Sequence, residues 1–281
     1  MSWNTIERTD HDNGIVRISL DDPETHNAQS LDMLTELNDV IKNLDSNRDN
    51  RVLILDGNGP SFSSGHDLEV IERDWKGGDW SARERLAWEN KYFWEPFWNL
   101  RDLGIPTIAQ VHGHCGAAGL MMASPCDLIM AAEDAEFFNP VNRMAANGVE
   151  ILLEPWEVGV RKAKELLWTG DSITGSEAEN LGMANHAVPE EELHERTITL
   201  ARKIAEMPPF AIHLSKKSLN FTLDEMGQRK SYEYHYMAHH LAHNSNEWRD
   251  WHEEAGQIAM EEGIREFIKH RDEPFEQHEN K

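Results

Sequence analysis

Two short, mainly apolar runs, each followed by a loop of small residues, most constrain the fold of this chain. The runs are residues 52–55 (VLIL) and 107–111 (TIAQV), and the loops that follow them are residues 57–65 and 113–119. Short apolar runs of this kind are typical of strands that are covered on both faces. The pattern therefore predicts an α/β protein with a buried sheet.

The other segments of the first half alternate between strand and helix patterns. Residues 15–20 largely alternate apolar and polar side chains, which predicts a strand. Apolar residues recur every three or four positions from Leu34 to Leu44, after Ser30 as a candidate N-cap, which predicts a helix. A further strand is predicted at residues 127–131 and an aromatic-rich helix at residues 80–100.

The second half has a different pattern. After about Pro155 the chain has almost no β-branched runs, and helices separated by glycine or proline are predicted at residues 161–168, 176–181, 190–205 and 210–221. The polar residues from Asp272 onward are expected to be frayed. We expect a core of strands and helices over residues 1–200 and a helical C-terminal region over residues 201–281.

Charge and composition exclude several classes of function. The 281 residues include 51 acidic and 27 basic side chains, a formal net charge of −24. Because nucleic-acid binding needs a basic surface that releases counterions, we expect no nucleic-acid partner. No stretch approaches the roughly 20 uninterrupted apolar residues of a membrane span, so no membrane partner is expected. Two cysteines, too few for a disulfide framework, and a start without a secretion signal predict a cytoplasmic location.

The loops that follow the two buried strands carry the chemistry. Residues 113–119 (GHCGAAG) and 59–68 (GPSFSSGHDL) are made mostly of small residues, which allow another molecule to approach the main chain. A helix that begins in such a loop points unpaired N–H groups outward. Two converging N–H donors define an oxyanion hole. The structural alternatives are close helix-to-sheet packing for residues 113–119 and a plain surface turn for residues 59–68.

Several ordered motifs run through residues 13–221. They are His26-Asn27-Ala28 after Asp22-Pro23, residues 61–68 (SFSSGHDL), residues 105–113 (IPTIAQVHG) continuing to Cys126-Asp127, residues 135–140 (AEFFNP), residues 163–170 (AKELLWTG) and residues 178–189 (AENLGMANHAVP). Together these motifs resemble the crotonase, or enoyl-CoA hydratase/isomerase, superfamily. The resemblance is highly specific because several motifs agree in order.

The resemblance implies an α/β fold of a particular kind, a spiral of ββα units with a helical C-terminal trimerisation region. It implies a homotrimer or a hexamer made of two trimers. The ligand would be an acyl-CoA thioester, so coenzyme A would enter as part of the substrate, and no separate cofactor or metal is expected.

The family motifs also imply site residues. By position, the main-chain N–H groups of His66 and Ala118 would hold the thioester oxygen, and the loss of one such donor in other enzymes costs about 10²–10³ in rate. The adenine and pantetheine of coenzyme A would lie along Ala28, Ser64, Asp67 and Leu68. A basic patch for the phosphates is needed, with candidates at His26, Arg161, Lys162, Lys216 and Lys217.

The chain departs from the family pattern at two positions. Typical hydratases of the family carry two glutamates that position water, and these positions hold Met121 and Val141 here. Neither side chain can move a proton, and one positioned acid or base contributes about 10²–10⁴ in rate. We therefore expect isomerase-like or other non-standard proton transfer. Together with Met122 and the nearby tryptophans, Met121 and Val141 suggest a roomy apolar acyl site.

Two other glutamates are candidate bases. Glu150 lies where some family members keep an acidic residue, and its neighbours Val149 and Ile151 could desolvate it. An exposed or ion-paired loop glutamate is the alternative. Glu95 is the weaker candidate, because it shares a helix face with Trp88 and Tyr92, although most such carboxylates are solvated or cap a helix.

Histidines and a cysteine suggest two further sites. Adjacent His114 and Cys115 could form a nucleophile and base, but core packing is favoured because geometry rather than adjacency defines such a pair. His235, His239 and His243 recur every four residues and could bind a metal. No acidic or cysteine ligand stands at a known spacing from them, so a solvated or interfacial helix face is favoured.

Two rival functions remain open from the sequence. One is a slow or unconventional enoyl-CoA hydratase. The other is a catalytically silent acyl-CoA-binding subunit that kept the oxyanion hole after losing its acids.

Overall fold

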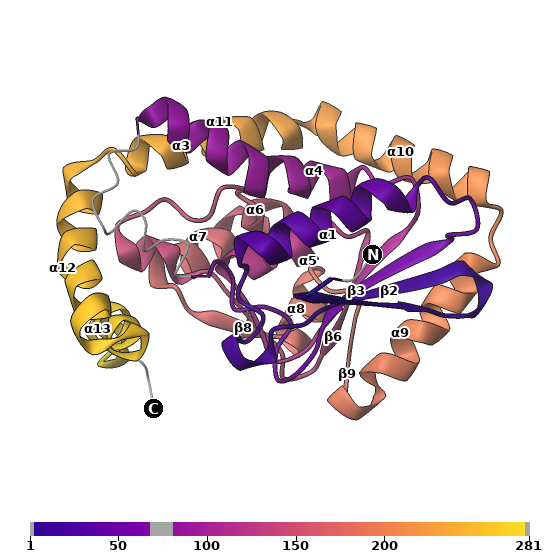
Figure 1. Cartoon of the computed structure of the whole chain (residues 1–281), viewed down its shortest axis with the longest axis horizontal. Coiled ribbons are helices and arrows are strands. Elements are labelled where there is room, and N and C mark those ends of the chain that lie inside the picture. The colour runs from indigo at the N-terminus through magenta and orange to yellow at the C-terminus, as the bar shows by residue number, and fades with distance from the viewer. Residues whose placement is uncertain (1–2, 68–80, 279–281) are drawn as a thin grey trace.

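The computed structural model describes residues 3–67 and 81–278 and contains two sheets (Figure 1). The larger sheet has six strands in the order β1-β2-β3-β4-β6-β9, parallel except for the antiparallel pair β1 and β2. Its strands are β1 (Ile6–Asp10), β2 (Ile15–Leu20), β3 (Val52–Gly57), β4 (Thr107–Val111), β6 (Leu128–Ala132) and β9 (His186–Val188). The smaller sheet contains β5 (His114–Gly116), β7 (Glu136–Phe138) and β8 (Ser172–Thr174).

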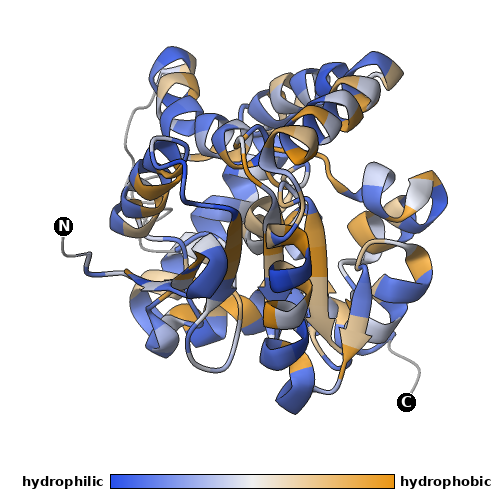
Figure 2. Ribbon diagram, turned by 90° about the vertical axis from the view of Figure 1, so that its right-hand side faces the viewer, coloured by the Kyte–Doolittle hydropathy of each residue, from blue (hydrophilic) through white to orange (hydrophobic). Residues whose placement is uncertain are grey.

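The centre of the large sheet is buried on both faces. Every residue of β3 and β4 is buried, as predicted from their mainly apolar runs. Helix α9 (Glu190–Ala205) packs against β2, β3, β4 and β6. Figure 2 shows the apolar strands in the interior and helices whose outer faces are mostly hydrophilic. The predicted α/β class and buried sheet are therefore confirmed.

The first helices are close to their predicted positions. Helix α1 (Leu31–Leu44) begins after Ser30, whose side chain accepts a hydrogen bond from Met33 N at 3.2 Å. The predicted aromatic helix forms α3 (Ala82–Glu89), a π-helical turn (Asn90–Trp94) and α4 (Glu95–Arg101) in direct succession. A short helix, α5 (Leu120–Ala123), follows β5.

The second half is mainly helical, as predicted, but it differs from the sequence analysis in two respects. Strands β8 and β9 lie between the predicted helices and were missed, because each has three residues, too few to give a sequence pattern. The chain is also helical beyond Asp272, whose carboxylate pairs with Arg143 and Arg271 and ties the last helix to the body. The helices, besides α9, are α6 (Glu154–Glu157), α7 (Gly159–Thr169), α8 (Gly175–Leu181), α10 (Pro209–Met226), α11 (Gln228–Ala242), α12 (Asn246–Glu262) and α13 (Ile264–Glu276).

Helices α10 and α11 lie along one side of the molecule, next to α3 and α4 (Figure 1). Ring contacts join these elements: Tyr236 stacks on Trp94 with centroids 4.6 Å apart, and Tyr232 meets Phe97 edge-on at 5.7 Å. Helix α11 also contacts the loop that contains Gly148 and Val149. Within the described ranges, no helix is both long and apolar enough to cross a bilayer.

Candidate active site

The two small-residue loops are tied to each other by main-chain hydrogen bonds. Ser63 N donates to His114 O at 3.0 Å, and Gly116 N donates to Ser63 O at 2.9 Å. Gly65 has φ +100°, and a Cβ atom there would lie 2.7 Å from Gly116 O. Because an ordinary Cβ contact is longer than this, the approach of the two loops requires glycine at position 65.

The main-chain N–H groups of His66 and Ala118 lie on these neighbouring loops. Gln29 exchanges hydrogen bonds with Gly65 O and Asp67 N in a parallel bridge, so the N–H of His66 faces away from Gln29. Ala118 lies in the 3₁₀ turn Ala117–Gly119, where the first N–H groups lack helical partners. Among the residues that the structure describes, neither N–H donates a hydrogen bond. Both remain available to an oxygen atom of a ligand.

The structure brings the candidate base Glu150 against the side chain of His66. Only 4 % of Glu150 is exposed, and its two oxygens lie 3.2 and 3.1 Å from His66 Nε2. Burial favours the neutral acid, but a protonated His66 ring and the hydrogen bond that it donates hold the pKa of Glu150 well below its usual value. The carboxylate is therefore ionised at neutral pH.

The other predicted base, Glu95, lies elsewhere. Its carboxylate is about half exposed and pairs with Lys42 Nζ at 2.7 Å. The structure thus gives Glu95 the solvated position that the sequence left open as its alternative, and adds an ion pair.

Met121 and Val141 occupy the two positions that hold glutamate in typical hydratases. Met121 is buried in α5 and lines a narrow cavity of about 30 Å³ together with Met122, Tyr92 and Phe93. Val141 lies in the 3₁₀ turn Pro140–Met144, next to the buried Asn139. The cavity at Met121 is therefore small, and the expectation of a roomy acyl site stays a prediction.

The positions expected along coenzyme A lie on two adjoining segments. Ser64 N donates to His26 O at 2.9 Å, and Ser64 Oγ donates to Thr25 O at 3.1 Å, so residue 64 lies beside the segment that contains Ala28. Asp67 directly follows His66, and Leu68 lies outside the described residues.

One candidate for the phosphate patch has another role in the fold. Lys216 is buried, and its Nζ donates to Asp127 Oδ2 at 2.8 Å and to Ile105 O at 3.1 Å. It is therefore engaged with the main sheet. His26 lies beside the Ser64 segment, with its Nδ1 2.9 Å from Ser61 Oγ.

The expectation of a solvated or interfacial histidine face on α11 is wrong. His235, His239 and His240 are all buried, because this face packs against the loop before Glu150. His235 Nε2 donates to Val149 O at 2.8 Å, and His239 Nδ1 donates to Gly148 O at 3.2 Å. The four-residue period was a correct signal that these side chains share a face.

Sequence reasoning missed one buried carboxylate near this face. Glu89, the last residue of α3, is 2 % exposed, and its Oε2 lies 3.2 Å from His240 Nε2 and 3.7 Å from His239 Nε2. Its helix is strongly polar, so the sequence pattern gave no sign of burial. The candidate nucleophile Cys115 is fully buried, which raises the pKa of its thiol and leaves it protonated.

Fold and site together define an α/β protein of ββα units that presents main-chain N–H groups from two loops beside a buried acid–imidazole pair. A family model described as enoyl-CoA hydratase/isomerase matches residues 10–278. The chain therefore belongs to the enoyl-CoA hydratase/isomerase family and has the crotonase fold that its motifs predicted.

Individual relatives agree with this assignment. The chain is 41 % identical over 251 residues to a putative enoyl-CoA hydratase of Mycobacterium tuberculosis, covering 83 % of this chain and 78 % of the relative. It is 31 % identical over 217 residues to a hydroxycinnamoyl-CoA hydratase-lyase of Pseudomonas fluorescens, covering 76 % and 77 %. A crystal structure of an enoyl-CoA hydratase/isomerase from Xanthobacter autotrophicus Py2 superposes with a TM-score of 0.88 at 28 % identity, covering 98 % of this chain and 99 % of that one.

Proposed function

We propose that this protein binds an acyl-CoA thioester, forms its enolate and moves a proton along the acyl chain, as in the isomerisation of a 3-enoyl-CoA to a 2-enoyl-CoA. The N–H groups of His66 and Ala118 hold the enolate oxygen. Family membership and the proximity of the two loops support this assignment. A thioester α-proton becomes removable only when the enolate oxygen is stabilised, which is the task of such donors.

The contact between Glu150 and His66 carries the proposal. An ionised Glu150 accepts the proton on His66 Nε2, which leaves the lone pair of the neutral ring on Nδ1. Within the described part of the chain, this Nδ1 is buried and has no hydrogen-bond partner. Imidazole suits proton transfer near neutral pH. We assign the proton transfer to His66 Nδ1 and the orientation of the ring to Glu150.

This assignment modifies the sequence expectation that Glu150 itself is the base. A carboxylate with a lowered pKa is a weak proton acceptor, so Glu150 serves better as a positioning residue. In the proposed step the C2–H bond breaks, its proton moves to Nδ1, and its electron pair enters the enolate. The protonated Nδ1, whose proton can exchange with solvent, then delivers a proton to C4 as the double bond moves from C3–C4 to C2–C3, so no oxidant or other reactant is needed.

The apolar side chains at positions 121 and 141 support isomerisation over hydration. Water addition in the family relies on a pair of acids at these positions, as the motif resemblance implies, and Met121 and Val141 cannot hold or deprotonate water.

The outer faces of α10 and α11 support self-association. They expose a set of large apolar side chains: Phe210, Leu214, Leu219, Phe221, Met226, Tyr234, Met237 and Leu241. A cluster of this size on the surface marks an interaction site. We propose that it contributes to a trimer or to a hexamer of two trimers, which light scattering would report as three or six times the 32.3 kDa chain mass.

Deuterium exchange tests the reaction. Incubating the protein in D₂O with butanoyl-CoA and with 3-hexenoyl-CoA should incorporate deuterium at C2, and 2-hexenoyl-CoA should form from the latter, both followed by mass spectrometry. We expect His66→Ala and Glu150→Gln each to slow exchange about 10²-fold or more, with acyl-CoA affinity nearly unchanged. His66→Ala keeps the main-chain N–H and so removes the imidazole alone. Glu95→Gln is the matched control.

Each rival has its own outcome in this experiment. Tight acyl-CoA binding without exchange in the unaltered protein would identify a silent binding subunit. Rapid conversion of 2-butenoyl-CoA to its 3-hydroxy product would identify a hydratase. Exchange that survives His66→Ala but not Glu150→Gln would return the role of base to Glu150.

A further inference from the structure

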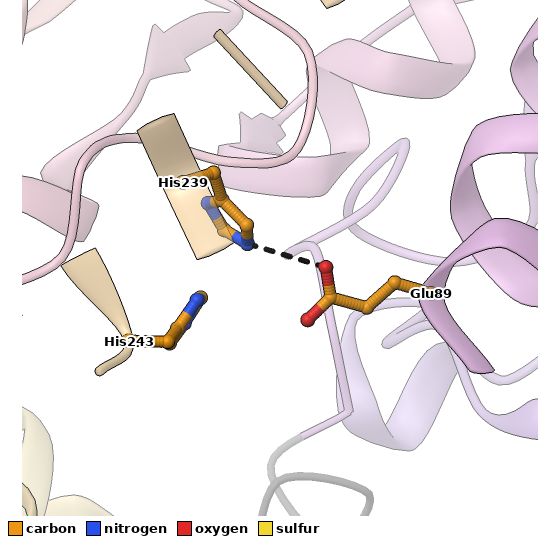
Figure 3. A group of neighbouring side chains, drawn as sticks. All are labelled: Glu89, His239 and His243. Atoms are coloured by element: carbon orange, nitrogen blue, oxygen red, sulfur yellow. Dashed lines mark ion pairs between the residues drawn. The ribbon is translucent and has the colours of Figure 1, made fainter. Parts of the chain in front are cut away.

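We propose that Glu89, His239 and His243 bind a divalent first-row transition-metal ion, of which zinc is the representative. Figure 3 shows the carboxylate and the two imidazoles pointing toward one another from α3 and the C-terminal end of α11. Their three donor atoms lie within 4.8 Å of one another. Ligand atoms of a tetrahedral zinc site are about 3.3 Å apart, as zinc–nitrogen bonds near 2.0 Å require, so a small closure of these side chains suffices.

The tautomer of His239 prepares it to be a ligand. A carbonyl oxygen can only accept, so the 3.2 Å contact with Gly148 O fixes the proton on His239 Nδ1. The lone pair of the neutral ring is then on Nε2. Histidines that bind metals commonly donate their other N–H to a main-chain carbonyl in this way, which holds the ring in place.

The lone pair on His239 Nε2 faces negative charge rather than a donor. Nε2 lies 3.7 Å from Glu89 Oε2 and 3.9 Å from Glu150 Oε1, and only 3 % of the residue is exposed. Among the described residues, Nε2 has no hydrogen-bond partner. A lone pair and two carboxylates in a buried space repel one another unless a cation lies between them.

The described neighbours of Glu89 divide between its two carboxylate oxygens. Among the described residues, Arg85 approaches Oε1 at 3.6 Å, whereas His239 and His240 approach Oε2, so Oε2 is the oxygen that faces the imidazoles.

The donor set selects the type of metal. One carboxylate with two imidazoles suits zinc and its first-row neighbours, whereas calcium and magnesium prefer sites made of oxygen ligands. The surroundings hold the second imidazole in place, because the His243 ring lies edge-on to His239 at 4.2 Å and to Trp248 at 5.1 Å.

Metal titration of the purified, tag-free full chain tests this site. We expect about one Zn²⁺ per chain by equilibrium dialysis, and Co²⁺ should give the intense visible bands of a tetrahedral centre. Glu89→Gln and His243→Gln should each weaken Zn²⁺ binding at least tenfold and remove the rise in Tm that Zn²⁺ causes in the unaltered protein. His235→Gln is the matched control, since its ring lies on the same buried face but donates to Val149 O, and it should keep the affinity within about threefold.

Other outcomes would overturn the proposal. Fifteen histidines and 51 acidic residues could bind zinc weakly on the surface, and such binding would be equal in all three variants. If a ligand variant does not fold, X-ray absorption of the zinc-loaded unaltered protein decides instead. It should show two imidazoles and oxygen at the metal, and a centre with sulfur or with oxygen ligands alone would contradict the assignment.

Discussion

The two parts of the site are built in different ways. The loop part, which carries the proposed oxyanion donors, consists of main-chain atoms on loops 61–67 and 113–119, which follow neighbouring parallel strands and are joined by their own hydrogen bonds. The side-chain part consists of Glu89 in α3, Glu150, and His239 in α11. Glu89 and His239 are about 150 positions apart in sequence. The first part depends on local backbone geometry, and the second on how distant elements pack.

This difference implies different sensitivities to mutation. A main-chain donor is lost only when the backbone moves, so almost any side chain at its position leaves it intact. A side-chain group is lost through one conservative substitution while the fold remains. Four variants test the contrast.

Gly65→Ala should have the largest effect. The substitution puts Cβ 2.7 Å from Gly116 O at φ +100°, so the two loops must separate. We expect C2 exchange to fall about 10²–10³-fold, the cost of losing an oxyanion donor. Gly182→Ala is the matched control, since Gly182 has φ +86° but an added Cβ there would meet nothing within 4 Å. It should cost only about 1–2 kcal/mol of stability. Equal activity of the two variants would contradict the role of loop contact.

Within the site, Glu150→Gln should have the next largest effect, which is a change in how stability depends on acidic pH. Its pKa in the folded protein lies below the value in the unfolded chain, so its contribution to stability is complete above about pH 4.5 and is lost as pH falls toward its folded pKa of about 2. Relative to Glu150→Gln, the unaltered protein should lose about 2 kcal/mol between pH 7 and pH 3. Urea unfolding from pH 7 to pH 3 measures the difference, and parallel curves would show that the His66 contact adds nothing.

Glu157 is a carboxyl group whose effect on stability has the opposite pH dependence. Removal from water, with a further contribution from nearby Glu154, raises the pKa of Glu157 to about 7. Its ionisation therefore lowers stability as pH rises from 4.5 through 7. We expect Glu157→Gln to be more stable than the unaltered protein by about 3 kcal/mol at pH 8 and equal to it near pH 4. A variant that is less stable at pH 8 would disprove the raised pKa.

Glu95→Gln should have the smallest effect. It removes an exposed ion pair with Lys42, which is worth less than about 1 kcal/mol. Exchange at C2 should be unchanged, measured alongside Glu150→Gln. A tenfold loss of exchange would restore Glu95 as a candidate catalytic group.

The sequence predicted the loop part of the site more completely than the side-chain part. The apolar runs of β3 and β4 and the small residues after them are local signals that predicted the two loops, and the family motifs then assigned His66 and Ala118 on them. The burial of Glu89 has no local signal, because its helix is polar and the histidines that face it belong to α11. The histidine period placed His239 and His243 on one face, but only tertiary packing determines that this face is buried.

The π-helical turn Asn90–Trp94 has one consequence for how such a site could be altered. A π turn accommodates one residue more than an α turn. Deleting a single residue there would let the helix continue regularly, but everything on one side of the deletion would rotate by about 100° relative to the other. Because aromatic contacts hold Phe97 and Trp98 in place, Glu89 would turn away from α11 even though Glu89 itself is not substituted. One inserted codon in an ancestral helix is therefore sufficient to create, or to abolish, the meeting of this carboxylate with the histidines.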